Sequence, residues 1–463
     1  MDPTAKPAHP HLEKIAGRFV RIGHEVAGVG KDIREIEELE RRRIHRYGRM
    51  LGPGVIAGAA DDDAGGIATY SIVGATTGFA LSWLLLASTP MLIAVQEMCA
   101  RVGNVARRGL ASAIKEKFGF PAALFSMALL AAANVATISA DIAGMAVALE
   151  LLSGGAVPWL WSVVPATLLA GYAIIYKNFS AIQKGLLGLS LFLVAYIAAG
   201  IISGPDWNLV LQQTLVPRIS LDSGFLIAAV GLLGTTITPY LFFWQARTEI
   251  EAHRTEHQLK KMKFDIFAGM IYSNVVSYFI IISAATALFQ YYDAGAGTFT
   301  INGETIAAGQ LSVREIALAL KPVAGDYTFY LFAIGLLGAS ALATIVLATS
   351  TAYAVCDTFG WPSGLNKRVW QARQFYATTA LALGAGAIAL FAGLNPIQAM
   401  FWSQVLCGIA VPFILYFLLR IVNDAGIMGV HTNNLTENAV GWGTFAIISG
   451  FVLMMFYSLI FPA

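Results

Sequence analysis

Charged side chains are scarce in this sequence. Asp, Glu, Lys and Arg make up 13% of the 463 residues, whereas about a quarter is usual in a soluble domain. Hydrophobic residues make up 57%, and the mean hydropathy is +0.66. The composition therefore excludes an ordinary soluble protein and predicts one integral membrane domain, residues 51–463.

Cysteine and histidine are also sparse. The three cysteines, Cys99, Cys356 and Cys407, stand far apart in or beside apolar stretches, which excludes a disulfide framework and a Cys-x-x-Cys metal site. Residues 253–257, HRTEH, fit a zinc-protease pattern, but they fall in a short basic loop, so we interpret the match as chance. The loops are too short for a catalytic domain, and we predict that the protein is not an enzyme.

Basic residues are concentrated in the first 50 residues, which hold 11 of the 30 Lys and Arg. Acidic residues are mixed with them, which excludes a nucleic-acid-binding arm. Residues 31–46 pair glutamates with arginines four positions later, a spacing that predicts a charged surface helix. We expect residues 1–50 to form a charged tail on the cytoplasmic side of a membrane.

Eleven apolar segments are long enough to cross a membrane as helices, which takes about 20 residues each. They are uniformly apolar rather than alternating, which excludes the strands of an outer-membrane barrel. The segments are residues 51–77, 80–100, 121–150, 156–176, 182–203, 222–246, 265–289, 326–355, 374–394, 396–420 and 441–461. The sequence predicts an all-α membrane protein with eleven transmembrane helices and a short helix in the long loop 290–325.

The loops between these segments differ in charge. With a cytoplasmic N-terminus, the inner segments hold 27 Lys and Arg and the outer segments hold 3. Cytoplasmic loops carry such an excess in membrane proteins. We therefore expect a multi-pass protein of the cell (inner) membrane, embedded in the lipid bilayer, with Ala463 outside. The oligomeric state is not defined by the sequence.

The first span contains three consecutive acids, Asp61, Asp62 and Asp63, followed by Ala64-Gly65-Gly66. A carboxylate at mid-membrane costs about 3 kcal/mol even on a lenient insertion scale. We expect the helix to unwind here, so that freed carbonyls and carboxylates form a cation site. Alternatively, the aspartates lie at a membrane edge and cap a helix that begins near Gly66.

The sixth span carries Pro239 in its interior, after Gly234, Thr235, Thr236 and Thr238. Proline removes a backbone hydrogen bond, so we expect a break here as well, although a simple proline kink would fit either span alone. Breaks five spans apart are typical of inverted-repeat transporters with a site at the membrane midplane. We predict a LeuT-like inverted repeat in which spans 1–5 and 6–10 form the two halves.

Several motifs carry a resemblance to a known family. They are GPGVIAGAADDDAGG in span one, QEMCARVG in span two, SADIAGMAVALELL in span three, TTITPY in span six and SQVLCGIAVPF in span ten. In the order and spacing of these motifs, the sequence resembles the Nramp family of divalent-metal transporters over nearly all of the chain after residue 50.

The resemblance implies a ligand set, although the site motifs depart from it. The family's Asp-Pro-Gly-Asn aligns with residues 63–66, which keeps the acid as Asp63 and replaces the Asn with Gly66. Its Met-Pro-His-Asn aligns with residues 238–241, so Thr238 replaces a thioether that favours soft metals. Either Asp61 or Asp62 could add charge. The candidate metal-site residues are Asp63, Ala60, Gly66, Thr235, Thr238, Gln404, Asp62 and Asp61.

The same alignment bears on proton movement. Asp141 matches the first member of the family's acidic pair, but Gly144 replaces the second, a Glu, and Gln245 replaces a His. Asn134 and Asp141 are polar groups in a membrane helix, which marks a pathway by default; bonding between helices is as good an interpretation for Asn134. The candidate pathway residues are Asp141, Asn134, Gln245 and Tyr240.

These departures resemble the divergent branch called Nramp-related magnesium transporters. Mg²⁺ prefers hard oxygen ligands and gives up water reluctantly. We expect a secondary transporter of divalent cations, Mg²⁺ first and Mn²⁺ second, without proton coupling and without a cofactor. The alternatives are a proton-coupled Mn²⁺/Fe²⁺ importer and an organic-solute transporter in which Asp63 is the counter-ion of an amine.

Overall fold

The computed structural model describes residues 52–176, 188, 191–252, 258–301, 304–307, 311–393 and 395–461. The predicted tail at residues 1–50, the HRTEH motif at 253–257 and Ala463 lie outside the described residues. The predictions made for them therefore stay predictions.

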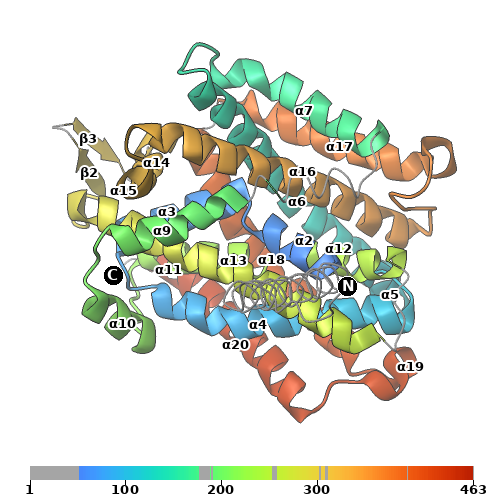
Figure 1. The fold of residues 1–463 in the computed structure, drawn as a ribbon. Helices are drawn as coiled ribbons and strands as arrows, with labels where there is room; N and C mark the ends of the chain where they lie inside the picture. Colours follow the sequence, from blue (N-terminus) through green and yellow to red (C-terminus); the bar gives the residue numbers. More distant parts are fainter. Residues whose placement is uncertain are drawn as a thin grey trace, which may run out of the picture. The chain divides into compact units, whose positions relative to one another are not determined.

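The described residues are mostly helical (Figure 1). The helices are α2 (Pro53–Asp61), α3 (Ala64–Thr77), α4 (Ser82–Arg101), α5 (Leu110–Phe118), α6 (Phe120–Leu152), α7 (Trp159–Tyr176), α9 (Ala195–Ile202), α10 (Trp207–Leu215), α11 (Ser223–Thr236), α12 (Pro239–Glu251), α13 (Leu259–Leu288), α14 (Val313–Ala317), α15 (Lys321–Ala324), α16 (Thr328–Phe359), α17 (Arg373–Leu390), α18 (Pro396–Val422), α19 (Ala425–Met428) and α20 (Leu435–Ile460). The all-α prediction is confirmed.

Most candidate membrane spans follow the predicted segments, and the predicted segment 182–203 lies partly outside the described residues. Within the described residues, 8 helices are long and apolar enough to cross a membrane, and up to 9 if the bent pair α9 and α10 counts as one span. The first predicted span falls outside this count because α2 and α3 have only 9 and 14 residues. The polar residues Arg373 and Gln374 at the start of α17 lower the hydropathy of that 18-residue helix.

Both predicted breaks are present. The first span ends its first helix at Asp61 and begins its second at Ala64, and the sixth span is interrupted between Thr236 and Pro239. Pro239 is the first residue of α12. A residue at this position makes no N–H hydrogen bond within the helix, so proline costs nothing there, and its fixed φ angle suits a helix start. Two pairs of helix ends, with their unpaired backbone groups, therefore lie buried inside the protein.

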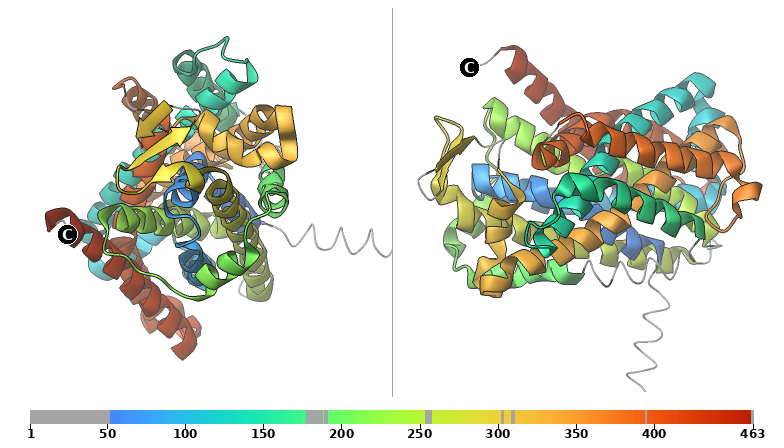
Figure 2. Two further views of the ribbon diagram at one scale, coloured as in Figure 1. Left: turned by 90° about the vertical axis from the view of Figure 1, so that its left-hand side faces the viewer. Right: turned by 90° about the horizontal axis from the view of Figure 1, so that it is seen from above.

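The broken helices lie within the bundle, while α7 and α17 run together along one edge (Figures 1 and 2). Both halves of the first span pack along α13, and α11 packs along α18. The long helices α6 and α16 pack along each other. The break in the first span is thus surrounded by helices of the second half of the chain.

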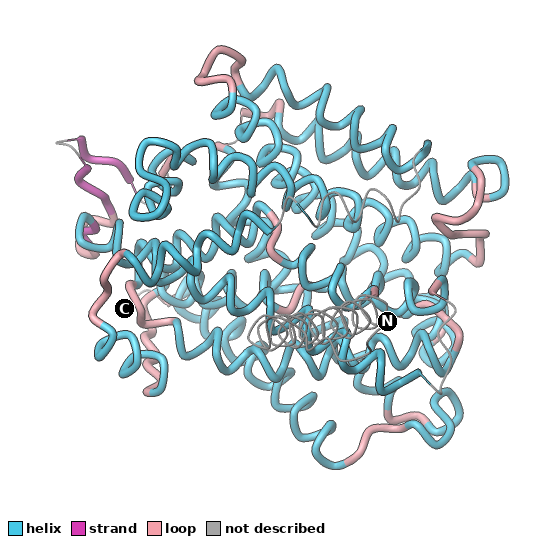
Figure 3. The backbone as a smooth tube through the Cα atoms, viewed as in Figure 1, coloured by secondary structure: helices cyan, strands magenta, loops and turns pink. Residues whose placement is uncertain are grey.

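A small antiparallel sheet lies at one end of the bundle, drawn in magenta in Figure 3. Its order is β1 (Tyr292–Asp293), β2 (Thr298–Ile301) and β3 (Glu304–Ala307). These strands were not predicted from the sequence. The short helix expected in this loop is α14, which begins at a capping box formed by Ser312 and Glu315.

Ion pairs lie near the ends of the helices. Arg101, at the end of α4, pairs with Glu437 of α20 at 3.1 Å. Lys117 of α5 donates a hydrogen bond to Asp424 in the turn after α18, and this bond holds the pKa of Asp424 below its usual range. These two ion pairs connect the ends of neighbouring helices and do not involve the breaks in the first and sixth spans.

Helices α2 and α13 touch through their backbones. A Cβ atom on Gly54 would lie 2.6 Å from the peptide nitrogen of Ile266, and one on Gly58 would lie 2.8 Å from the Cα atom of Gly269. Real Cβ atoms do not approach backbone atoms so closely, so only glycine fits at these positions. Small residues at such crossings let membrane helices pack closely.

We predict that Gly58→Leu destabilises the protein, because the new side chain must push α2 away from α13. Overpacking of this kind costs roughly 1–3 kcal/mol. The melting temperature of the purified protein, measured by thermal challenge and size-exclusion chromatography, should fall. Gly443→Leu in α20 is the matched control, since a Cβ there meets nothing within 4 Å. Equal melting temperatures for the two variants would contradict the close α2–α13 contact.

Candidate cation site

Asp63 occupies the break in the first span and caps α3. Its Oδ1 accepts a hydrogen bond from the peptide N–H of Gly66 at 2.5 Å, and its carbonyl accepts one from Ile67 at 2.9 Å. A carboxylate at a helix N-terminus is stabilised by the unpaired N–H groups and the helix dipole. The alternative interpretation is thus correct in that Asp63 caps a helix, and Asp63 is fully buried within the protein.

Gln404 of α18 faces Asp63. Its Nε2 lies 3.4 Å from each carboxylate oxygen of Asp63, and its Oε1 has no hydrogen-bond partner among the described residues. A Cβ on Gly65 would lie 2.9 Å from the Cδ of Gln404. Glycine at position 65 therefore lets the amide approach the break and leaves an amide oxygen available there.

Three oxygens surround the space beside Gly66. A Cβ on this residue would lie 2.8 Å from Oγ1 of Thr235, 3.2 Å from Oδ1 of Asp63 and 3.3 Å from the carbonyl of Asp61. The Thr235 hydroxyl is buried and has no hydrogen-bond partner among the described residues. Leaving a buried hydroxyl without a hydrogen bond costs about 1–3 kcal/mol of folding stability, so a water or an ion bound to this hydroxyl would offset that cost.

The break in the sixth span bonds to the end of α2. The hydroxyl of Thr238 donates to Oδ1 of Asp61 at 3.1 Å, and the hydroxyl of Tyr240 donates to the carbonyl of Ala60 at 2.8 Å. Ser350 of α16 in turn donates to the carbonyl of Tyr240 at 2.8 Å. These bonds hold the last turn of α2 against the first turn of α12.

Asp62 points away from this group and toward α13. Its Oδ1 accepts hydrogen bonds from Ser277 at 2.9 Å and from Ser273 at 3.2 Å, and Ser273 also lies 3.2 Å from Oδ2 of Asp61. The structure therefore places Asp61, not Asp62, beside the sixth span. Neither serine was predicted as a site residue, although a spacing of four residues places both side chains on one face of an apolar helix.

Asp141 of α6 is a second cap for α3, since its Oδ1 accepts from the N–H of Ala64 at 3.1 Å. One turn further, a Cβ on Gly144 would lie 2.6 Å from both the Cβ of Ala64 and the Oγ of Ser340. The position where the family has a glutamate is therefore filled by neighbouring atoms, with no room for a longer side chain in this arrangement.

Two candidate pathway residues lie apart from this group. Asn134 donates to Oγ1 of Thr351 at 2.8 Å, which joins α6 to α16 and matches the interhelical interpretation. Gln245 donates to Oε1 of Glu249 at 3.0 Å, one turn further along α12. Glu249 is fully buried, and the sequence analysis missed it.

Asp61, Asp62, Asp63 and Asp141 form a group of buried carboxylates, each no more than 1% exposed. Within the described residues, no lysine, arginine or histidine forms an ion pair with any of them. Burying an ionised carboxylate without a counter-charge is strongly unfavourable. Among the described residues, no three Asp, Glu, His or Cys side chains converge to hold a metal ion, so a cation bound here would also need the hydroxyl, amide and carbonyl oxygens at the two breaks.

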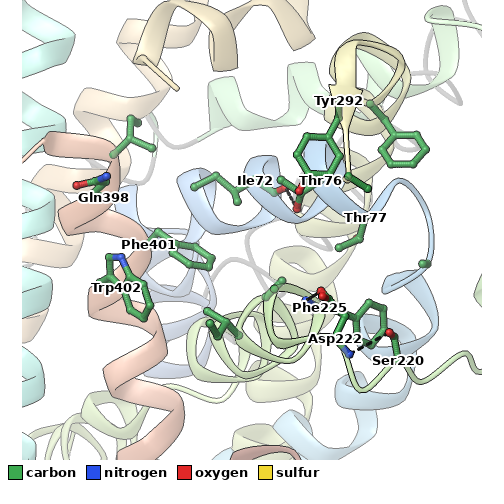
Figure 4. Close-up of a pocket in the computed structure, with 17 residues that line it drawn as sticks. Ile72, Thr76, Thr77, Ser220, Asp222, Phe225, Tyr292, Gln398, Phe401 and Trp402 are labelled. Atoms are coloured by element: carbon green, nitrogen blue, oxygen red, sulfur yellow. Dashed lines mark hydrogen bonds between the residues drawn. The ribbon is translucent and has the colours of Figure 1, made fainter. Parts of the chain in front are cut away.

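A cavity of about 500 Å³ opens at the far end of α3 (Figure 4). It is lined by residues of α3, α11, α18 and the segment after α13, including Ile72, Thr76, Asp222, Tyr292 and Phe401. Aromatic side chains from α18 and from the sheet edge form its walls, and Asp222 contributes a carboxylate.

A plug separates this cavity from the carboxylates. A Cβ on Gly231 would lie 3.3 Å from Val405, 3.4 Å from Phe401 and 3.5 Å from Thr69. Thr69 follows Gly66 by three positions and Phe401 precedes Gln404 by three, so each of these two residues lies about one helical turn from a residue at the break. The cavity thus approaches the break from one end and stops one helical turn short of it.

Comparisons with known proteins agree on the fold. Divalent metal cation transporter MntH of Deinococcus radiodurans is 26% identical over 450 residues, covering 95% of this chain and 93% of the relative. MntH of Verminephrobacter eiseniae is 28% identical over 424 residues, covering 87% and 88%. The crystal structure of the Eremococcus coleocola manganese transporter with an aromatic bis-isothiourea substituted compound matches with a TM-score of 0.67 at 22% identity, covering 88% of this chain and 85% of that one.

More distant transporters share the same arrangement. Mhp1, a nucleobase-cation-symport-1 family transporter, matches with a TM-score of 0.53 at 15% identity over 89% of this chain and 94% of that one. These likenesses and the two breaks confirm the LeuT-like prediction. The family model Nramp, described as natural resistance-associated macrophage protein-like, matches residues 54–458. Since this match runs from the first turn of α2 almost to the end of α20, the chain belongs to the Nramp family.

Proposed function

We propose that this protein is a secondary transporter of divalent metal cations, with Mg²⁺ preferred and Mn²⁺ also carried. The observation that supports this best is the set of oxygens at the two breaks: the carboxylates of Asp61 and Asp63, the hydroxyls of Thr235 and Thr238 and the amide of Gln404. Hard oxygen ligands suit Mg²⁺, which binds through one or two carboxylates and keeps several waters.

The size of the space supports an ion rather than an organic solute. Three oxygens lie within 3.3 Å of the position that a Cβ on Gly66 would take, so the surroundings of Gly66 are too tightly packed for an organic solute. The Ala60 carbonyl is a further ligand in this proposal, and the Tyr240 hydrogen bond fixes its direction. A carbonyl oxygen has two lone pairs, so this bond and an ion do not exclude each other.

The Mn²⁺ alternative also has support. The curated relatives are named divalent metal cation transporters, and the Eremococcus coleocola protein is a manganese transporter. Mn²⁺ is also bound by carboxylate, carbonyl and water oxygens. Thr238 carries no sulfur, so the site lacks the ligand that would reject abundant Mg²⁺ in favour of Mn²⁺.

We propose that the tail and the N-terminal end of α2 face the cytoplasm, and that the chain resides in the cell (inner) membrane. In this orientation the cavity of about 500 Å³ opens to the outside, and ions reach the break past Phe401. A reporter active only in the cytoplasm should stay silent when it is fused after Ala463.

We also propose that transport proceeds without proton coupling. Asp141 is engaged as a cap of α3, and Gly144 supplies no second acid beside it. Glu249 follows Pro239 by ten residues, about 15 Å along a helix, with Tyr240 and Gln245 in between. A neutral phenol and an amide do not relay protons readily at neutral pH.

The ion site is tested by Asp63→Asn, which keeps the shape of the side chain and removes its negative charge. Binding of Mg²⁺ and Mn²⁺, measured by isothermal titration calorimetry, should fall to background, because the charge that offsets ion dehydration is lost. The matched control is Asp293→Asn, an exposed turn residue outside the bundle, which should bind as wild type. Wild-type binding by Asp63→Asn would place the ion elsewhere.

Selectivity is tested by competition. Millimolar Mg²⁺ should inhibit Mn²⁺ uptake into liposomes by the wild-type protein, because hydroxyl and carboxylate oxygens do not discriminate against Mg²⁺. The double variant Thr238→Met and Gly66→Asn should weaken this inhibition, since it introduces the thioether and the amide that the family motifs carry at the aligned positions. Mn²⁺ uptake by wild type that is insensitive to Mg²⁺ would refute the magnesium proposal.

Coupling is tested in proteoliposomes that contain a pH-sensitive dye. Addition of Mg²⁺ or Mn²⁺ should produce metal uptake without internal acidification. An ionophore that exchanges divalent cations for protons serves as the positive control for the dye. Acidification that requires both the metal and this protein would show a proton path and favour the proton-coupled alternative.

A further inference from the structure

A second group of oxygens lies between α2 and α13, apart from the oxygens beside Gly66. It contains both carboxylate oxygens of Asp62, Oδ2 of Asp61 and the hydroxyls of Ser273 and Ser277. Ser277 also contacts the hydroxyl of Tyr70. All of these side chains are at least 98% buried, and Oδ2 of Asp62 has no hydrogen-bond partner among the described residues.

The hydrogen atoms in this group do not suffice for its acceptors. Ser273 has one hydroxyl hydrogen but lies 3.2 Å from a carboxylate oxygen of Asp61 and 3.2 Å from one of Asp62. It can donate to only one of them at a time. Because Ser277 already donates to Oδ1 of Asp62, Ser273 can serve Oδ2 of Asp61, and Oδ2 of Asp62 is the buried carboxylate oxygen left without a donor.

The charge balance also indicates that Asp62 lacks a positive neighbour. With Asp61, Asp62, Asp63 and Asp141 ionised, the breaks carry four negative charges, and one divalent ion offsets two. No ion pair with a basic side chain offsets the others within the described residues. Asp62 faces away from the oxygens of the sixth span, so an ion bound there neutralises it least.

We propose that Asp62, Ser273 and Ser277, with Oδ2 of Asp61, form a binding site for a sodium ion, distinct from the divalent site. The C-terminal end of α2 adds its negative helix dipole, and the C-terminal ends of half-helices coordinate sodium ions in transporters with broken spans. The bound ion cross-links the first half of span one to α13.

The ligand chemistry favours sodium over a second divalent ion. Mg²⁺ gives up its waters reluctantly and usually keeps several of them when it binds, whereas the oxygens of this group all belong to side chains, two of them neutral hydroxyls. Two neutral hydroxyls and a shared carboxylate provide less charge than a divalent ion needs for its dehydration. A monovalent ion loses less hydration energy and accepts such neutral ligands.

The test is binding of radioactive ²²Na⁺ to the purified full chain in buffer free of divalent ions, with choline replacing sodium. Wild type should show saturable binding that unlabelled sodium displaces. Asp62→Asn and Ser277→Ala should each weaken it about tenfold or more, the loss expected for one ion ligand. Asp63→Asn should keep it, and so should the matched control Ser340→Ala, a buried hydroxyl on α16.

The outcomes separate this proposal from the divalent site. Ser277→Ala that elutes as a monodisperse protein and fails to bind sodium supports it, even if Asp62→Asn does not fold. Absence of saturable sodium binding in wild type would overturn it, as would unchanged binding by Ser277→Ala. Loss of sodium binding in Asp63→Asn would mean that sodium occupies the divalent site, and equal displacement by potassium would overturn the assignment to sodium.

Discussion

The need to bury four carboxylates without basic partners governs the middle of this molecule. Asp61, Asp62, Asp63 and Asp141 are each paired instead with dipoles: the N–H groups at the start of α3, and the hydroxyls of Thr238, Ser273 and Ser277. Such dipoles reduce the desolvation cost of a carboxylate but do not neutralise it. The breaks, the caps and the polar residues on α13 follow from this one requirement.

The acids do not all serve the same purpose. Asp141 and Asp63 both satisfy the start of α3, one at Ala64 and one at Gly66. Asp61 connects the two breaks through Thr238. Because Gly144 packs against Ala64 and Ser340, the region beside Asp141 is tightly packed. Position 144, which the resemblance described above aligns with a glutamate, is therefore a point of helix packing in this chain.

The sequence predicted the elements whose cause is local. Apolar runs predicted the helices, and Pro239 and the Asp-Gly stretch predicted the two breaks, because each rests on backbone chemistry. The direction of Asp62 could not be predicted, since it depends on how α2 crosses α13 through Gly54, Gly58 and Gly269. The strands between 292 and 307 were missed because their short, mixed sequence carries little periodicity.

The same distinction applies to the candidate site. Asp63, Thr235, Thr238 and Gln404 were identified by alignment with a family motif, and the structure brings their side chains to the two breaks. Asn134 was chosen only as a polar residue in a membrane helix, and it bonds to α16 instead. A polar residue in a membrane helix therefore predicts a site residue only when it also lies at a helix break or in a site motif.

The cavity above Phe401 has a consequence for where an ion sheds its water. Six waters at about 30 Å³ each occupy about 180 Å³, so a cavity of about 500 Å³ admits a divalent ion with its full inner hydration shell. The contact between Phe401, Thr69 and Gly231 is too close to let a hydrated ion pass. For a divalent ion that enters through this cavity, stripping of the hydration shell and opening of the plug then become a single event.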